Sequence, residues 1–137
     1  MAQVMAPATD YMKMNDTEHA WLDCACEEMS ALISQPDYNK RTAIDAITKL
    51  KVAMLLHYAE EEGIMKKVCY PHMRSHKRSH DYFLTKVSSF ITNLTGASAD
   101  LSGDDWTEMV RLLDNHVRSH DHNLAEFLSS THETELS

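Results

Sequence analysis

The chain has 137 residues, of which 43% are apolar, and this suits one globular domain with a single hydrophobic core. Its net charge of −8 argues against a nucleic-acid partner and against an anionic membrane surface. The sequence has no run of about 18 apolar residues, so no membrane span is expected.

Proline and glycine divide the chain into four predicted helices. Breaks are expected at Gln35-Pro36-Asp37, at Tyr70-Pro71, and in the glycine-containing segment 95–103. Abundant methionine, leucine, alanine, lysine and glutamate favour helix between these breaks. The predicted helices cover residues 17–34, 39–68, 71–94 and 104–129.

The ends of these helices carry recognisable signals. Asp16 and Asp104 suit the N-cap positions of the first and last helices, and Pro71 suits the first turn of the third. The expected organisation is an N-terminal arm at 1–15, a bundle at 16–130 and a C-terminal tail at 131–137.

Apolar residues spaced three and four apart form a seam along each helix, as is typical of bundle packing. Histidines lie in the same seams as the apolar residues. The first three seams are His19, Leu22, Cys26, Met29 and Ile33; then Ile47, Leu50, Met54, His57, Glu61, Ile64 and Val68; then His76, His80, Phe83, Val87, Phe90 and Leu94. Short connections make neighbouring helices antiparallel, so the predicted fold is all-α, an up-down-up-down four-helix bundle.

A lone histidine on an apolar face is usually a hydrogen-bonded core residue. Here that interpretation must hold on several helices, and it must also bury Glu61 one turn after His57. An unpaired buried carboxylate costs several kcal/mol. A metal ion removes this cost, and imidazole with carboxylate suits iron, manganese or zinc, with enough ligands for two metals.

The predicted ligands lie at one level of the bundle. His19 lies near the start of the first helix, His57 near the end of the second, and His76 near the start of the third. In antiparallel helices these positions coincide, so the fourth helix should contribute from its second half. That half contains His116, His120, Asp121 and His122.

These residues together resemble the hemerythrin family, particularly its single-domain bacterial members. The resemblance covers about residues 16–122. The pattern reads Asp16-x-x-His19, then His57-x-x-x-Glu61-Glu62-x-x-Met65-x-x-x-x-Tyr70-Pro71, then His76-x-x-x-His80-x-x-Phe83, and last His116-x-x-x-x-Asp121.

The resemblance implies two iron ions in an oxo- or hydroxo-bridged, non-haem centre. One iron would be held by His76, His80 and His116, and the other by His19 and His57. Glu61 and Asp121 would bridge the two. The iron with two histidines keeps an open position for dioxygen. Its pocket should be dry and apolar, because water and protons would release peroxide and leave the site ferric. The candidate lining residues are Leu22, Ile64, Met109, Leu112 and Leu113.

The five-residue step from His116 to Asp121 is out of phase on a regular α-helix, where each residue turns about 100°. The two halves of the fourth seam join only across this step. We therefore expect a π-bulge near residues 117–120, a feature often found at functional sites. The rival arrangement is a regular helix that uses His116 and His120, with Asp121 turned outward.

Several neighbouring polar residues are expected outside the site. His72 is expected to be exposed, and Glu60 and Glu62 are expected to form a solvated acidic edge. Cys26 lies in the first seam and should be a core residue, whereas Cys24 should be exposed.

The resemblance implies reversible dioxygen binding for carriage, storage or buffering, and not an enzyme as the first hypothesis. Leu112 occupies a position where the family often has tryptophan, so the pocket could admit solvent. The alternatives are a di-iron enzyme acting on peroxide, nitric oxide or ferrous iron, and an oxygen sensor that works through a partner chain. Three cysteines and no recognisable signal peptide favour the cytoplasm. Dioxygen is the expected partner, and no protein partner is identified.

Overall fold

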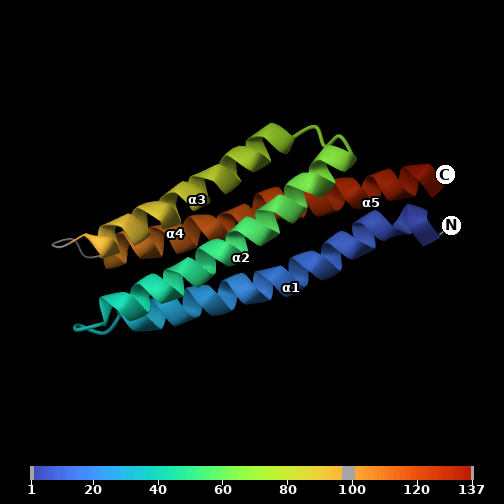
Figure 1. Cartoon of the computed structure of the whole chain (residues 1–137). Coiled ribbons are helices and arrows are strands. Elements are labelled where there is room, and N and C mark those ends of the chain that lie inside the picture. The colour runs from blue at the N-terminus through green and yellow to red at the C-terminus, as the bar shows by residue number, and fades with distance from the viewer. Residues whose placement is uncertain (1, 97–100, 137) are drawn as a thin grey trace.

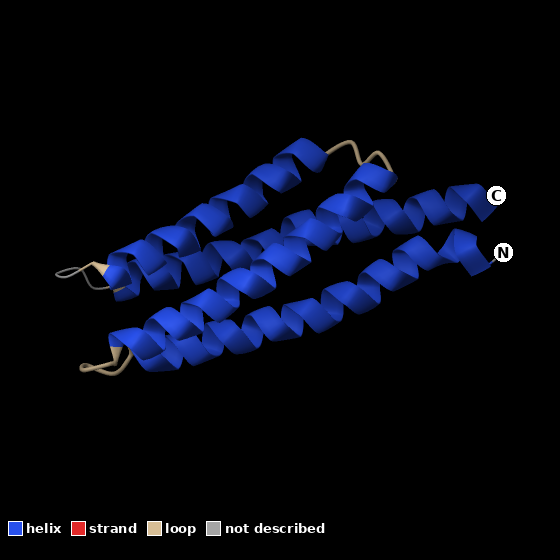
Figure 2. Cartoon of the chain, in the orientation of Figure 1, coloured by secondary structure: helices blue, strands red, loops and turns tan. Residues whose placement is uncertain are grey.

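The computed structural model describes residues 2–96 and 101–136, with side chains described for residues 10–96 and 101–130. Within these residues all regular structure is helical (Figure 2), which confirms the predicted all-α helical bundle. The elements are α1 (Ala2–Ile33), α2 (Lys40–Lys67), α3 (Met73–Thr95), α4 (Gly103–His116), the π-helix η1 (Val117–Asp121) and α5 (His122–Leu136).

Four rods make up the molecule, because α4, η1 and α5 follow one another without a break. Figure 1 shows each rod returning beside the previous one, with both termini at the same end. Helix α1 packs against α2, α4 and α5, whereas α3 packs against α2 and α4. Side chains from all four rods can therefore meet along the central axis.

The apolar core consists of two clusters. The larger includes Leu22, Leu50, Phe83 and Trp106, and lies toward the end where α1 joins α2. The smaller lies toward the termini and consists of Tyr11, Met65, Tyr70, Leu124 and Leu128. Along every rod, the predicted ligands fall between residues of the two clusters. The polar layer is thus enclosed above and below by apolar side chains.

Two helix starts are capped by side chains. Asn39 accepts a hydrogen bond from the Thr42 N–H, and Ser102 accepts one from the Asp105 N–H. The prediction that Asp104 is the cap is wrong, because α4 begins one residue after Ser102 and Asp104 lies in its first turn. Pro71 likewise lies in the turn before α3 rather than in its first turn.

Helix α1 begins at Ala2, so the predicted start at residue 17 with Asp16 as cap is wrong. Residues assigned to the N-terminal arm continue the helix, and Tyr11 is buried in the smaller cluster. Side chains of residues 2–9 lie outside the described residues. The C-terminal segment is helical to Leu136, and its side chains beyond residue 130 are also outside the described part.

Helix α2 ends in a left-handed residue that turns the chain toward α3. Cys69 has a φ of 53°, and its N–H donates to the carbonyl of Lys66, whereas the Tyr70 N–H donates to that of Met65. This pair of bonds is a Schellman motif, in which glycine usually takes the left-handed position. The short turn brings His76 of α3 back toward Glu61 of α2.

In the part of the chain that the structure describes, no helix combines the length and the apolar character needed to cross a membrane.

Candidate metal centre

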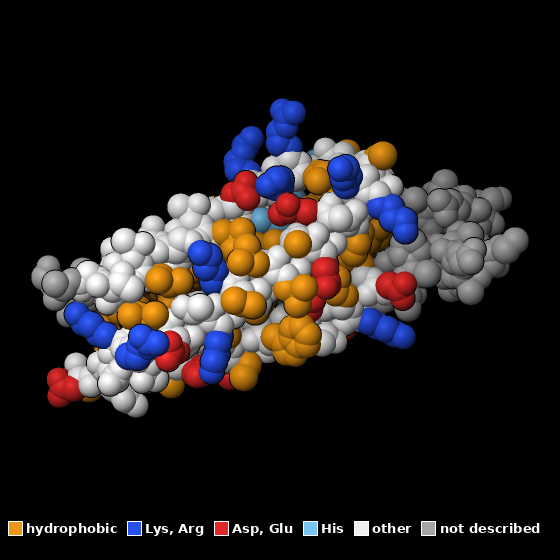
Figure 3. All heavy atoms as spheres, viewed as in Figure 1, with side chains coloured by type: hydrophobic (Ala, Val, Ile, Leu, Met, Phe, Trp, Pro, Cys, Tyr) orange, Lys and Arg blue, Asp and Glu red, His pale blue; other side chains and the backbone are white. Residues whose placement is uncertain are grey.

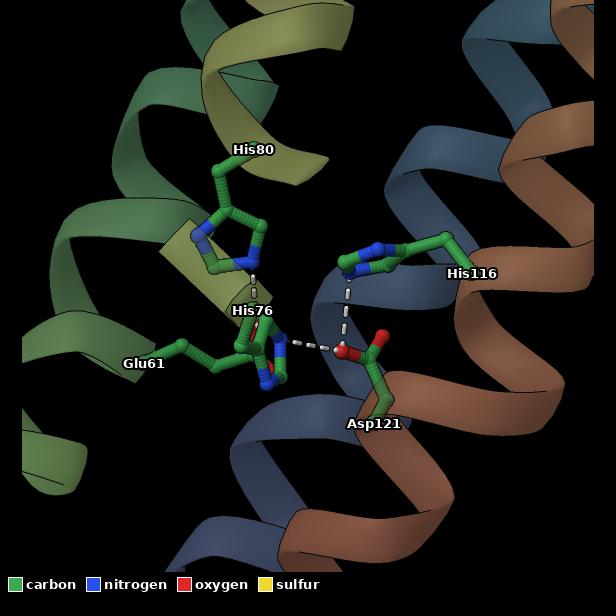
Figure 4. A group of neighbouring side chains, drawn as sticks. All are labelled: Glu61, His76, His80, His116 and Asp121. Atoms are coloured by element: carbon green, nitrogen blue, oxygen red, sulfur yellow. Dashed lines mark hydrogen bonds and ion pairs between the residues drawn. The ribbon is translucent and has the colours of Figure 1, made fainter. Parts of the chain in front are cut away.

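The structure brings all seven predicted ligands together in the centre of the bundle. One group consists of Glu61, His76, His80, His116 and Asp121 (Figure 4), and a second of His19, His57 and Asp121. All are buried except His19, which is partly exposed. The seven residues come from α1, α2, α3, α4 and η1, so the site depends on the packing of the whole bundle.

The three-histidine group converges through Nε2 atoms on the two carboxylates. The Nε2 of His80 lies 2.8 Å from Oε1 of Glu61, and the Nε2 of His76 lies 3.1 Å from the same oxygen. On the other side, Oδ1 of Asp121 lies 3.0 Å from Nε2 of His76 and 3.1 Å from that of His116. Three imidazoles and two carboxylates therefore face one small volume.

The second group shares Asp121 with the first. Oδ2 of Asp121 lies 2.9 Å from Nε2 of His19 and 4.0 Å from Nε2 of His57. The same His57 nitrogen lies 3.7 Å from Oε1 of Glu61. Oδ1 of Asp121 thus faces His76 and His116 of the first group, and Oδ2 faces the two histidines of the second.

Both carboxylates are held in the charged form. Burial alone raises the pKa of Glu61 and Asp121, but the surrounding histidines outweigh burial and lower both values. His76 and His80 have the largest lowering effect on Glu61, and His116 and His19 on Asp121. Deprotonated carboxylates are the form that binds a cation.

Three of the candidate ligand histidines have a hydrogen-bond partner at Nδ1, the ring nitrogen that does not face the carboxylates of Glu61 and Asp121. His57 Nδ1 lies 2.9 Å from Glu18, His80 Nδ1 lies 2.9 Å from Glu62, and His116 Nδ1 lies 2.6 Å from the Ser79 hydroxyl. Such bonds fix the ring and leave Nε2 free to face a metal. The prediction that Glu62 is only a solvated edge residue is therefore wrong, because His80 reaches it across the α2–α3 contact.

Tyr11 donates its hydroxyl hydrogen bond to Oε2 of Glu61. Burial, followed by the nearby negative charges of Glu61 and Asp121, raises the pKa of Tyr11 far above its ordinary value, so the phenol stays protonated. Sequence reasoning placed Tyr11 in an arm and missed this contact. The signal was present, since Tyr11 lies eight residues before His19, which is about two helical turns.

In the fourth rod, a π-helix accommodates the five-residue step from His116 to Asp121. Helix η1 covers Val117–Asp121, and both His116 and Asp121 are buried and face the centre. The predicted π distortion is confirmed. The rival arrangement is wrong, because Asp121 points inward and His120 belongs to neither candidate metal group.

Among the buried atoms that lack a hydrogen-bond partner in the described residues are Nε2 of His57, Nε2 of His116 and Oδ1 of Asp121. His116 and Asp121 lie 3.1 Å apart, but not in hydrogen-bonding geometry. Buried polar atoms without partners are costly, and a cation placed between them removes that cost. The nitrogen and oxygen donor set therefore fits a borderline metal such as iron.

Comparison with protein families agrees with this geometry. Residues 12–128 match the model of the hemerythrin HHE cation binding domain, which covers most of the chain. The chain belongs to the hemerythrin family.

The chain is similar to several curated hemerythrins at modest identity. It is 28% identical over 94 residues to a bacteriohemerythrin of Stenotrophomonas maltophilia, 69% of this chain and 61% of that one. It is 32% identical over 80 residues to hemerythrin subunit alpha of Lingula reevii, 58% and 60% of the two chains. To the alpha subunit of Lingula anatina it is 28% identical over 115 residues, 83% of each chain. No solved structure matches the chain.

The remaining polar residues near the candidate metal centre take outer positions. His72 is exposed beside Tyr70, as predicted, and His122 pairs with Glu126 on the surface. His120 is half-buried, with its ring centre 5.3 Å from that of His76. Burial lowers the pKa of His120, which favours the neutral ring.

The three cysteines are free, with Cys24 exposed and Cys26 buried, which confirms both predictions. Cys69 is exposed at the α2–α3 turn. Burial raises the pKa of Cys26 to about 12, so the thiol stays protonated in the core.

A cavity of about 500 Å³ opens beside His19, between α1 and α4. Leu22 and Leu113, two of the five residues predicted to line an oxygen pocket, line this cavity. The other three predicted lining residues lie elsewhere: Met109 is in the larger core cluster, Ile64 packs on the smaller one, and Leu112 lines a separate groove beside His116. The difference arises because the cavity follows the α1–α4 contact, which helical spacing does not reveal.

Proposed function

We propose that this protein binds dioxygen reversibly at a non-haem, carboxylate-bridged di-iron centre. The carrying observation is Asp121, whose two oxygens are shared between a three-histidine group and a two-histidine group. A single metal would not require one carboxylate to face four imidazoles in two sets. The hemerythrin family supports iron as the metal.

The two groups differ in the number of ligands they offer. His76, His80 and His116 join both carboxylates on one side, whereas His19 and His57 share Asp121 on the other. The second position therefore has fewer protein ligands and leaves room for a small molecule. Bound by the two groups together, an iron pair would supply reversible electron exchange with dioxygen.

The protein's own contribution is exclusion of water and control of protons. Apolar clusters close the polar layer on both sides, and the ring of Tyr58 stacks on His80 with centres 3.9 Å apart. Tyr11 keeps its proton and donates a hydrogen bond to Glu61, so this carboxylate is held in place without being neutralised. A dry site of this kind slows irreversible oxidation.

The finer points of the setting belong to the same proposal. A reducing cytoplasm suits three free cysteines. We assign the oxygen-binding unit to residues 16–130 and its course to an up-down-up-down antiparallel bundle. The role is carriage, storage or buffering of dioxygen.

Anaerobic loading with ferrous iron, followed by air and then argon, tests the proposal. We expect two irons per chain and an absorption spectrum that appears in air and reverses under argon. Asp121→Ala should lose both irons, because Asp121 serves both groups, whereas His19→Ala should lose one. His72→Ala is the matched control and should keep both. One iron per wild-type chain, or a spectrum that argon does not reverse, contradicts the proposal.

The cavity favours a second candidate function. Its volume of about 500 Å³ exceeds the needs of dioxygen, and exposed Asp23, Glu27 and Asp114 line it with His19. A solvent-accessible route suits a di-iron enzyme that consumes peroxide, or one acting on nitric oxide or ferrous iron. Many turnovers of peroxide per chain, with rapid conversion to the ferric form in air, favour the enzyme over the carrier.

A further inference from the structure

A band of exposed apolar side chains lies over α1 and α2 on the face shown in Figure 3. Val52, Leu55 and Leu56 of α2 are 60%, 47% and 45% exposed, and Trp21 of α1 is 52% exposed. Trp21 and Leu55 lie at the same level, because His19 and His57, each two residues away, have ring centres 4.9 Å apart. We call these four residues the Leu55 face. Clustered large apolar side chains of this kind mark an interaction surface.

The exposed stripe of α2 continues from large residues into small ones. Val52, Ala59 and Gly63 share one side of the helix at 3.6 residues per turn. A Cβ atom added at Gly63 would meet nothing within 4 Å. Glycine inside a helix is unfavourable relative to alanine, and no contact in the described chain requires it here. Close approach of another backbone does require a small residue.

Side-chain size along the stripe is complementary when the α2 helices of two copies pack antiparallel to one another. An antiparallel pairing centred between Leu55 and Leu56 sets Val52 of each copy opposite Ala59 of the other. It likewise sets Thr48 opposite Gly63. Larger side chains thus meet smaller ones on both sides of the centre.

Charge on the stripe is complementary under the same reversal. Asp45 lies near the start of α2 and Lys66 in its last turn, both exposed, and the pairing sets each opposite the other. Asp45 is otherwise paired only with exposed Arg41, at 3.5 Å, and Lys66 has no ion pair within the described residues. A surface that complements itself in this way suits a two-fold interface.

We propose that two copies of this chain associate through the Leu55 face about a two-fold axis, with α2 antiparallel to α2 of the second copy. The association buries Val52, Leu55, Leu56 and Trp21 and joins Asp45 to Lys66 at both ends. It stands independently of the proposed oxygen binding, since none of these residues is a candidate ligand.

Sedimentation velocity of the metal-loaded chain, from about 1 to 100 µM, tests association. We expect a species of twice 15.6 kDa at the higher concentrations. Leu55→Asp should weaken association at least tenfold, because it buries a charge at the centre of the interface. Tyr82→Asp is the matched control, since Tyr82 is a similarly exposed apolar residue on α3 and should leave the dimer intact. Unchanged helical circular dichroism and metal content show that both variants fold.

A charge exchange tests the antiparallel register. Asp45→Lys and Lys66→Asp should each weaken association, because each sets like charges opposite one another at both ends. The double variant restores opposite charges and should regain affinity to within about threefold of wild type. A folding defect would not be rescued by the second substitution.

Three results overturn the proposal. The first is a chain that stays monomeric at every concentration, whether or not another protein binds the face. The second is a dimer that survives Leu55→Asp, which would place the interface elsewhere. The third is a double charge variant that associates no better than the single ones, which would exclude this register.

Discussion

At the residue scale, the outward nitrogen of each candidate ligand decides how firmly its ring is held. Glu18, Glu62 and Ser79 meet the Nδ1 atoms of His57, His80 and His116. The first two partners carry negative charge, and the third is neutral. Of the rings that face Glu61, those of His57 and His80 are therefore braced by carboxylates, whereas Nδ1 of His76 has no hydrogen-bond partner among the described residues.

Glu18→Gln should weaken metal binding about tenfold, because loss of the carboxylate makes the His57 ring a poorer and less firmly oriented ligand. Competition with a metal chelator measures the change in affinity. Glu28→Gln is the matched control, since Glu28 is exposed on the same helix. Equal affinities of the two variants would show that Glu18 does not support His57.

Sequence reasoning identified the ligands but not all of their partners. In Thr17-Glu18-His19, Glu18 reads like an ordinary surface acid next to a seam histidine. Its burial follows from the approach of His57 on another helix, 39 residues away. A contact across such a distance in sequence leaves no periodic signal.

At the element scale, η1 is a π-helical segment that accommodates one additional residue in an otherwise continuous helix. The residues before and after η1 keep a regular seam. Leu113 and His116 are buried before it in the chain, and Leu124 and Leu128 are buried after it. The mismatch between the two registers was visible in the sequence. The start of α1 was placed wrongly, because Asp16 was interpreted as an N-cap although the helix begins at Ala2 and continues through it.

Deletion of Ser119 should be tolerated. It shortens the step from His116 to Asp121 to four residues, which a regular α-helix places on one face. We expect the deletion variant to retain both metals, with affinity reduced by less than about tenfold. Metal analysis after gel filtration gives the number of ions per chain.

Deletion of Asp114 is the control for this prediction. Asp114 is exposed in the regular part of α4, so its loss rotates His116 by about 100° away from the centre. This variant should lose metal. If the Ser119 deletion loses metal as completely, the π-helix does more than accommodate an additional residue.

At the scale of the whole molecule, metal and protons compete for the same buried layer. Burial alone lowers the pKa of His57 and His76, but Asp121 and Glu61 raise both values to about 9 in the metal-free chain. Two buried carboxylates thus attract either a cation or protonated histidines. The bundle needs one or the other to balance its central charge.

The metal-free chain should therefore lose stability as pH rises from 6.5 to 9. Groups whose folded pKa is raised stabilise the fold fully below their unfolded value, and this contribution disappears as pH passes the folded value. We expect Tm to fall by roughly 5–10 °C across this window. Calorimetry of chelator-treated protein at several pH values measures it.

The metal-loaded protein is the control, because its ligands are already deprotonated and should show no loss in this window. A metal-free Tm that stays level or rises between pH 6.5 and 9 contradicts the prediction. It would mean that His57 and His76 are neutral in the fold and that the carboxylates are balanced in another way.

The sequence by itself determined the four helical rods, the seams that enter the core and the seven residues that meet at its centre. The rods and the seams follow from local periodicity, which 3.6 residues per turn imposes on any buried helix, whereas the choice of His116 and Asp121 in the fourth rod came from the resemblance to the hemerythrin family. Even the π-helix followed from a break in that period between His116 and Asp121.

Only the tertiary structure decided which helix faces which at the site. It joined Glu18 to His57, Glu62 to His80 and Tyr11 to Glu61, and it opened a cavity beside His19 between α1 and α4. The physical reason is that the helical period specifies only the direction in which each side chain leaves the axis of its own helix. The distance and rotation of the neighbouring helix come from packing over the whole core.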